Sequence, residues 1–164
     1  MSRASEANYL GFDLGASSGR AFVGTLRDGA LRLRVFGRFT NAPVWSDGRL
    51  RWDVARLWRE MTRCLRRCAE GDLPRPDSIG VSAWGVDFGL IGRDGEPVAA
   101  PVCYRDASTQ GMDRHIARRL GRRRLYRLSG LLPDRVSTLA QLMAMRRDGA
   151  AAPLADRRAL LLIP

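Results

Sequence analysis

Apolar residues in the first forty positions follow the two-residue period of extended strands. We expect strands over residues 9–15, 20–26 and 31–39. Asp28-Gly29, a dipeptide favoured in tight hairpins, separates the second strand from the third. In the third strand leucine and valine alternate with arginine, which predicts a half-buried strand near a sheet edge. The pattern therefore predicts a three-stranded antiparallel meander.

Residues 53–70 carry the clearest helical pattern, because apolar side chains recur at steps of three and four while arginines fill the other face. Asp53 suits the N-cap, and Gly71 suits the position that follows a helix. Cys64 and Cys68 fall on the apolar stripe, so we expect them in the core. As a pair four residues apart they could also bind a metal, but the chain lacks the further ligands that zinc needs.

The rest of the chain alternates between strand and helix patterns. We expect a buried strand over 78–83, a strand over 86–91, a short strand near 97–98, helices over 108–120, 122–129 and 138–148, and a buried strand over 158–164. This order is typical of an α/β fold. The last segment is apolar to its end, whereas chain termini are normally polar and exposed. We therefore expect one incomplete domain over 1–164, truncated inside its fold.

The amino-acid composition excludes several classes of catalytic mechanism and metal site. The 164 residues include 28 basic side chains, all of them arginine, and 17 acidic ones, for a net charge of +11. Without lysine, a Walker-A phosphate lysine and any Schiff-base mechanism are excluded. The single histidine, His115, excludes an HExxH zinc site. Three cysteines fit a reducing compartment, and no apolar run is long enough for a membrane helix, so we expect a cytoplasmic protein without a membrane partner.

The basic excess lies toward the C-terminus, because residues 101–164 carry 13 of the arginines and only 5 of the acidic residues. Clustered arginines such as Arg122, Arg123 and Arg124 would suit a nucleic-acid-binding module. Tyr126 is the one aromatic residue interleaved with these arginines, whereas single-strand binding uses several stacking platforms. The alternative, which we favour, is a solvated basic face without a nucleic-acid-binding role.

A first candidate site follows the first predicted strand. Its turn is built from small residues and is flanked by a carboxylate and a guanidinium: Asp13, Ala16, Ser17, Ser18, Gly19 and Arg20. Backbone N–H groups and serine hydroxyls can approach phosphate oxygens there, and arginine adds a fork of charge. Asp13 could hold a hydrated Mg²⁺. The alternative is a plain glycine- and serine-rich hairpin turn.

A second candidate site follows the predicted strand over 78–83. Trp84 could present a flat apolar face to a sugar ring, Gly85 allows the backbone to come close to a ligand, and Asp87 could accept hydrogen bonds from hydroxyls. Polar groups at the end of a buried strand often contact ligands. The alternative is a β-bulge with a buried tryptophan and a capping aspartate.

The residues together resemble the N-terminal part of the FGGY carbohydrate kinases, members of the actin-like ATPase-domain superfamily. The matching segments follow in order along nearly the whole chain: 13–20, Trp52-Asp53, 77–81, 84–88, Tyr104-Arg105-Asp106 and Ser129-Gly130. The resemblance implies a ribonuclease-H-like core in the first of two domains. It assigns Ala16, Ser17, Ser18, Gly19 and Arg20 to ATP phosphates, and Gly85, Trp84 and Asp87 to the sugar.

The resemblance also implies the reaction, which is ATP-dependent phosphorylation of a ketose, with L-rhamnulose at its 1-hydroxyl expected. The catalytic base would lie beyond Pro164 in an absent C-terminal half, so we expect this chain to be inactive alone. Ser108 and residues 133–138 depart from the family pattern near the expected sugar side. A related deoxyketose such as L-fuculose therefore stays open, as does a non-catalytic actin-like domain that acts through a partner.

Overall fold

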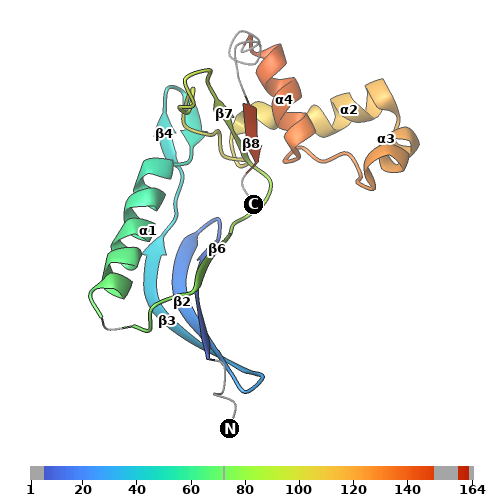
Figure 1. Ribbon diagram of the computed structural model, residues 1–164. Helices are drawn as coiled ribbons and strands as arrows, with labels where there is room; N and C mark the ends of the chain where they lie inside the picture. The colour runs from blue at the N-terminus through green and yellow to red at the C-terminus, as the bar shows by residue number, and fades with distance from the viewer. Residues whose placement is uncertain (1–5, 72, 150–158, 163–164) are drawn as a thin grey trace. The chain divides into compact units, whose positions relative to one another are not determined.

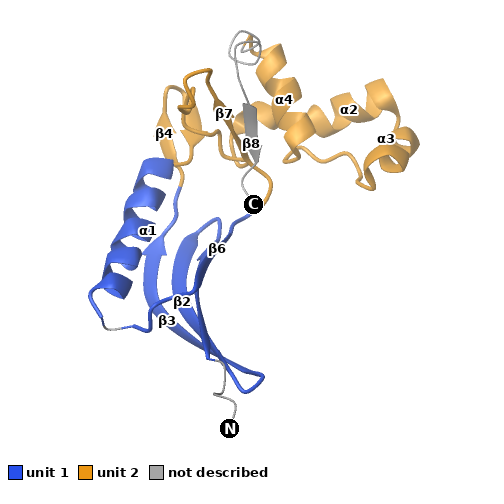
Figure 2. Cartoon of the chain, in the orientation of Figure 1, with its two compact units in different colours: residues 1–42, 53–84, 164 blue, residues 43–52, 85–163 orange. Residues whose placement is uncertain are grey.

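The computed structural model of the chain describes residues 6–71, 73–149 and 159–162 (Figure 1). The chain forms two compact units (Figure 2). Unit 1 comprises residues 1–42, 53–84 and 164, and unit 2 comprises residues 43–52 and 85–163. Each unit is described below by itself.

The described residues of unit 1 form a four-stranded sheet and one helix. Strands β1 (Ala7–Leu14), β2 (Ser18–Arg27) and β3 (Ala30–Thr40) form the predicted antiparallel meander, and β6 (Ser78–Ser82) pairs parallel to β1. The strand order is β3-β2-β1-β6, which confirms that β3 lies at an edge.

Helix α1 (Val54–Ala69) covers one face of the unit 1 sheet. The Asp53 carboxylate caps it as predicted, accepting a hydrogen bond from the Arg56 amide at 2.8 Å. Cys64 and Cys68 are buried, which confirms their expected place in the core. The core residues of unit 1 come from β1, β2, β3 and α1 with Leu73: Leu10, Phe12, Leu14, Ala21, Val23, Phe39, Leu57, Cys64, Cys68 and Leu73.

Two burial predictions for unit 1 are wrong. Residues 78–82 are exposed along their whole length rather than buried, with Ile79 at 54%. Leu33 is 63% exposed although it alternates with arginine. The register explains both exposures. Ile79 pairs with Leu10 but lies on β6, beyond the strands whose residues form the core with α1. Leu33 pairs with Gly24 on the sheet face opposite α1, and no described element of unit 1 covers that face.

The described part of unit 2 contains two pairs of short antiparallel strands and three α-helices. Strands β4 (Val44–Ser46) and β5 (Arg49–Arg51) pair antiparallel, and β7 (Phe88–Ile91) pairs antiparallel with β8 (Ala159–Leu162). The helices are α2 (Met112–Leu120), α3 (Arg122–Ser129) and α4 (Thr138–Arg147), after a 3₁₀ turn η1 (Ala107–Thr109). The buried helical core is formed by Met112, Ile116, Leu125, Ala140 and Ala144.

The strands and helices of unit 2 refine the sequence predictions. The helix expected over 108–120 is divided at Gly111, whose φ of +75° ends the 3₁₀ turn before α2 begins. The short strand near 97–98 is a single bridge from Pro97 to Ile91. Of the segment expected at 158–164, β8 is confirmed as a strand, while the expected burial of its side chains lies outside what the structure describes.

Candidate functional site

The β1–β2 turn brings the two charged residues of the first candidate site together. Asp13 and Arg20 are cross-strand neighbours in the register, and Arg20 Nη2 lies 2.9 Å from Asp13 Oδ2. Both side chains are about half exposed, and Ser17 and Ser18 are exposed between them. The turn therefore presents hydroxyls and a guanidinium to solvent on a rigid hairpin.

Asn41, a residue that the sequence analysis did not single out, holds this turn from behind. Its side-chain Nδ2 donates to the Gly15 carbonyl at 2.8 Å, and its backbone N–H donates to the Ser17 carbonyl at 3.0 Å. The Gly15 N–H closes the turn on the Ser18 carbonyl at 2.9 Å. Asn41 is 4% exposed, so the turn is anchored by a buried amide just beyond the end of β3.

Gly19 is fixed by packing. A Cβ atom on Gly19 would lie 2.1 Å from the Phe39 ring. Glycine at position 19 therefore leaves room for the Phe39 ring. This packing accounts for the small residue whether or not a phosphate binds there.

At the β1–β2 turn the described residues offer one carboxylate, that of Asp13, to a metal ion. Among them no group of three or more His, Cys, Asp or Glu side chains gathers to hold an ion. This donor set fits a hydrated Mg²⁺ that takes one carboxylate, Asp13, and otherwise water and nucleotide phosphates. Such an ion would compete with Arg20 for the Asp13 carboxylate.

The structure places the residues of the second candidate site in both units. Trp84 belongs to unit 1, where it is partly buried against the core. Gly85 and Asp87 belong to unit 2. Gly85 has a φ of +70°, and no atom lies within 4 Å of the position that a Cβ would take. The backbone is thus open to close approach at Gly85.

Asp87 points inward and is 1% exposed. Its Oδ2 accepts a hydrogen bond from the indole Nε1 of Trp52, and its Oδ1 accepts one at 3.0 Å from Nε2 of Gln141. Gln141 was missed by the sequence analysis, and Trp52 was noted only as part of a motif. Asp87 therefore serves first as an internal acceptor that ties the segment before β7 to the end of β5 and to α4.

A second buried carboxylate organises the other end of the β4–β5 hairpin. Asp106 accepts hydrogen bonds from the Leu50 amide at 2.7 Å and the Ser108 amide at 2.9 Å, and Arg49 Nη1 lies 3.2 Å from it. Burial alone would raise the pKa of Asp106, but these hydrogen bonds together lower it. The carboxylate is therefore held in its charged form.

Arg49 also reaches Asp148, at 2.6 Å from Nη2 to Oδ2. Hydrogen bonds from Arg147 and then Arg49 lower the pKa of Asp148. Asp148 and Asp106 in turn raise the pKa of Arg49 against the opposing effect of burial. These charges tie the β4–β5 hairpin to the end of α4.

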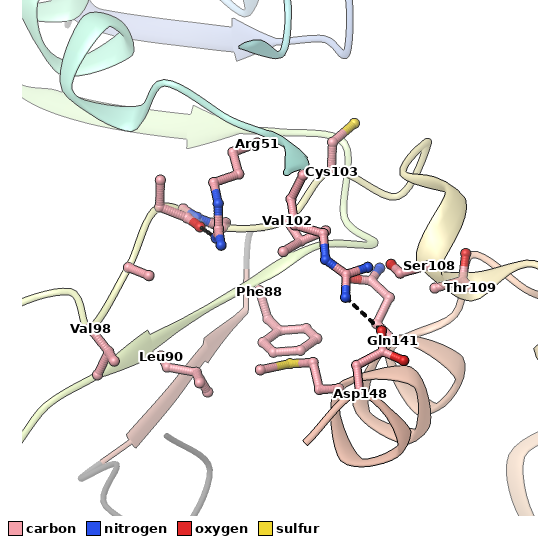
Figure 3. A pocket seen from close by; sticks show the side chains of 15 residues that line it. Arg51, Phe88, Leu90, Val98, Val102, Cys103, Ser108, Thr109, Gln141 and Asp148 are labelled. Carbon is pink, nitrogen blue, oxygen red and sulfur yellow. Dashed lines mark hydrogen bonds and ion pairs between the residues drawn. The ribbon is translucent and has the colours of Figure 1, made fainter. Parts of the chain in front are cut away.

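Figure 3 shows a cavity of about 310 Å³ in unit 2, beside these charges. Phe88 and Leu90 of β7 and Val102 give it apolar walls, while Gln141 and Asp148 approach from α4. Gln141 thus contacts both the cavity and the Asp87 carboxylate. The sequence could not have revealed the cavity, because its walls come from segments up to about a hundred residues apart.

Sequence comparison relates the chain to rhamnulokinases. It is 45% identical over 136 residues to the rhamnulokinase of Klebsiella pneumoniae (strain 342), covering 81% of this chain and 28% of that protein. It is 38% identical over 160 residues to that of Pectobacterium carotovorum, covering 96% and 32%. The chain therefore spans less than a third of the length of these relatives. No protein-family profile matches it.

Comparison with solved structures shows the fold. A gluconate kinase from Lactobacillus acidophilus superposes with a TM-score of 0.78 at 12% identity, covering 97% of this chain and 32% of that one. A xylulose kinase from Rhodospirillum rubrum gives 0.75 at 15% identity, with 96% and 32% covered. Such structures have the actin-like ATPase fold, which confirms the predicted α/β fold class. No described helix is long and apolar enough to cross a membrane.

Proposed function

Because this chain belongs, as an N-terminal part, with the rhamnulokinases among the FGGY carbohydrate kinases, we propose that it serves the ATP-dependent phosphorylation of L-rhamnulose at the 1-hydroxyl. The observation that carries the proposal is the 36–38% identity to relatives of that name along 96% of the chain. In this proposal the chain is the incomplete N-terminal domain, and the catalytic base is supplied by further polypeptide. The protein would act in the cytoplasm.

The β1–β2 turn would bind the phosphates of ATP. Ser17 and Ser18 would donate their hydroxyls, and Arg20 would pair with phosphate oxygens once Mg²⁺ takes Asp13. Mg²⁺ supplies charge neutralisation when bound. Because phosphoryl transfer is catalysed mainly by positioning and electrostatics, a turn anchored by Asn41 suits this role.

Gly85 would line the sugar site, with Trp84 and Asp87 as neighbours. The open space beside Gly85 supports close approach of a sugar hydroxyl to the backbone. Asp87 would shape this segment from within, since both of its oxygens already accept hydrogen bonds from Trp52 and Gln141.

The experiment is calorimetric titration of purified 1–164 with Mg-ATP and, separately, with L-rhamnulose, L-fuculose and D-xylulose. We expect Mg-ATP binding that Asp13→Asn and Arg20→Ala weaken, while Asp28→Asn, in the other hairpin of the meander, leaves it unchanged. We expect L-rhamnulose to bind more tightly than the other two ketoses. Tighter binding of L-fuculose than of L-rhamnulose would make L-fuculose the proposed substrate instead. Binding of no ketose would overturn the sugar assignment.

Turnover is tested in the same preparation. We expect no sugar-dependent ADP release from 1–164 alone. Release that requires both ATP and sugar and that Asp13→Ala abolishes would overturn the requirement for further polypeptide.

A further inference from the structure

We propose that Gln141 is a positioning residue that fixes the segment of Gly85, Val86 and Asp87 and couples it to the segment before α4. The proposal rests on the proposed function, because the importance of this segment for the sugar comes from Gly85. Gln141 itself would not touch the substrate.

Three acceptors surround a single amide nitrogen. Nε2 of Gln141 lies 3.1 Å from the Val86 carbonyl oxygen, 3.0 Å from Asp87 Oδ1 and 3.0 Å from the Val136 carbonyl oxygen. The residue is 5% exposed, so water does not replace these partners readily. One side chain thus joins two segments about fifty residues apart in the sequence.

The helix explains how the side chain reaches this point. Ser137 caps α4, and the Gln141 N–H donates to the Ser137 carbonyl at 3.0 Å, in the first turn. Side chains on a helix tilt toward its N-terminus, so Gln141 extends back toward Val136. The first turn of α4 therefore carries the amide to the place where the segment before β7 begins.

The chemistry of the cluster favours an amide. A carboxylate and two carbonyl oxygens converge, and together they demand a donor. The glutamine NH₂ group has two hydrogens for three acceptors, so one hydrogen is shared. A glutamate at this position would place further hydrogen-bond acceptors against the three already there. An apolar side chain would leave three buried acceptors without this donor, which lowers the stability of the folded chain.

The consequence for the site concerns Gly85. Gly85 has a φ of +70°, and apart from its chain neighbours no atom lies within 4 Å of the position that a Cβ would take. The next two residues, Val86 and Asp87, carry the restraint through Gln141 and Trp52. Residues 133–138, where the chain departs from the family pattern, are tied to the same amide through Val136.

The test compares Gln141→Met with Ala144→Gly in the full chain. Ala144 lies on the same helix, is 2% exposed and belongs to the helical core. Its replacement by glycine lowers helix stability without changing the contacts of Val86, Asp87 or Val136. The readouts are amide hydrogen exchange at Gly85 and Val86 by NMR, the affinity for L-rhamnulose by calorimetry, and the melting temperature.

We expect Gln141→Met to accelerate exchange at Gly85 and Val86 and to weaken L-rhamnulose binding by about tenfold or more. Ala144→Gly should lower the melting temperature without either effect. If Gln141→Met matches Ala144→Gly in exchange and affinity, the positioning role is overturned. If exchange at Gly85 responds to Gln141→Met but the wild-type chain binds no ketose, the positioning role stands and the sugar assignment fails.

Two further variants secure the test. If Gln141→Met does not fold, Gln141→Asn retains an amide on a shorter stem and should loosen Gly85 to a smaller extent; wild-type exchange and affinity in that variant would overturn the proposal. A double variant, Asp87→Asn with Gln141→Glu, swaps the amide and the carboxylate and restores only the contact between these two side chains. We expect that variant to remain impaired, since the Val86 and Val136 carbonyls would still face an acceptor; full recovery would contradict the three-way contact.

Discussion

At the scale of single residues, Phe39 sets the size of its neighbour in the proposed phosphate turn. A side chain at Gly19 would press into the Phe39 ring. We expect Gly19→Ala to lower the free energy of unfolding by about 1–3 kcal/mol, as overpacking does. Gly80→Ala is the matched control, because no atom lies within 4 Å of its Cβ position, and should change stability by less than about 0.5 kcal/mol. Urea unfolding measures both, and equal effects would contradict the packing explanation.

The lowered pKa of Asp106 predicts that this carboxylate contributes to stability in a pH-dependent way. Because its pKa is lower in the folded than in the unfolded chain, its contribution to stability is complete above the ordinary aspartate value near pH 4 and is lost as pH falls through the folded value. We expect Asp106→Asn to cost about 1–3 kcal/mol at pH 7, where the Leu50, Ser108 and Arg49 donors lose a charged acceptor.

The measurement is the urea midpoint at several pH values between 7 and 3. The wild-type chain should lose more stability over this range than Asp106→Asn does. An identical pH dependence in both proteins would show that Asp106 is not among the groups responsible.

Residue types in the sequence indicated the candidate site residues but not the partners that surround them in the fold. The aspartate and arginine flanking the turn were identified from their positions, and the register places them face to face. The inward direction of Asp87 depends on an indole 35 residues before it and an amide 54 residues after it. No periodic pattern records such partners, because they meet only when separate elements pack.

At the scale of elements, the β4–β5 hairpin shows a signal that was present but not used. Asp47 and Gly48 have φ values of +51° and +69°, as a tight hairpin turn with two left-handed residues requires. The sequence analysis identified Asp28-Gly29 by the same signal. The strands around Asp47-Gly48 are three residues long, too short for alternation to show.

This turn can be tested directly. Gly48→Ala should lower the free energy of unfolding by about 1–2 kcal/mol, because a Cβ is strained in the left-handed region. Asp47→Asn should be neutral, since asparagine adopts that region readily. Thermal unfolding of the two variants distinguishes them, and a neutral Gly48→Ala would contradict the strained-turn assignment.

Exposure of whole strands could not be inferred from the sequence. Alternation in β3 predicted the strand, yet Leu31, Leu33 and Val35 are all exposed. Periodicity shows that two faces differ, whereas burial depends on whether another element covers the apolar face. For β6 the same reasoning applies, because its apolar residues lie beyond the core that α1 completes.

At the scale of the whole molecule, the net charge of +11 predicts attraction to any polyanion. We expect weak, sequence-independent DNA binding at low salt that is lost at physiological salt. Changing Arg122, Arg123 and Arg124 to alanine should reduce the logarithmic salt slope by up to about 2.7 and leave L-rhamnulose affinity unchanged. These arginines begin α3, where positive charge opposes the helix dipole, so stability should not fall.

Filter-binding titrations at several salt concentrations measure this effect. Tight, sequence-dependent DNA binding at physiological salt would favour the alternative of a nucleic-acid-binding module. Binding that is insensitive to the triple substitution would show that the attraction does not come from α3.

The outer position of β6 has a consequence for the colloidal behaviour of the chain. In the described part of unit 1 this strand ends the sheet, and Ile79 and Val81 are exposed along it. An apolar outer strand with unpaired backbone groups is a template for pairing with another copy, and lysine on such a strand blocks that pairing. We expect light scattering to increase with protein concentration and Val81→Lys to suppress the increase; an unchanged concentration dependence would place the association elsewhere. Suppression by Val81→Lys would show that β6, rather than the net charge or the other outer strand β3, limits the solubility of this arginine-rich chain.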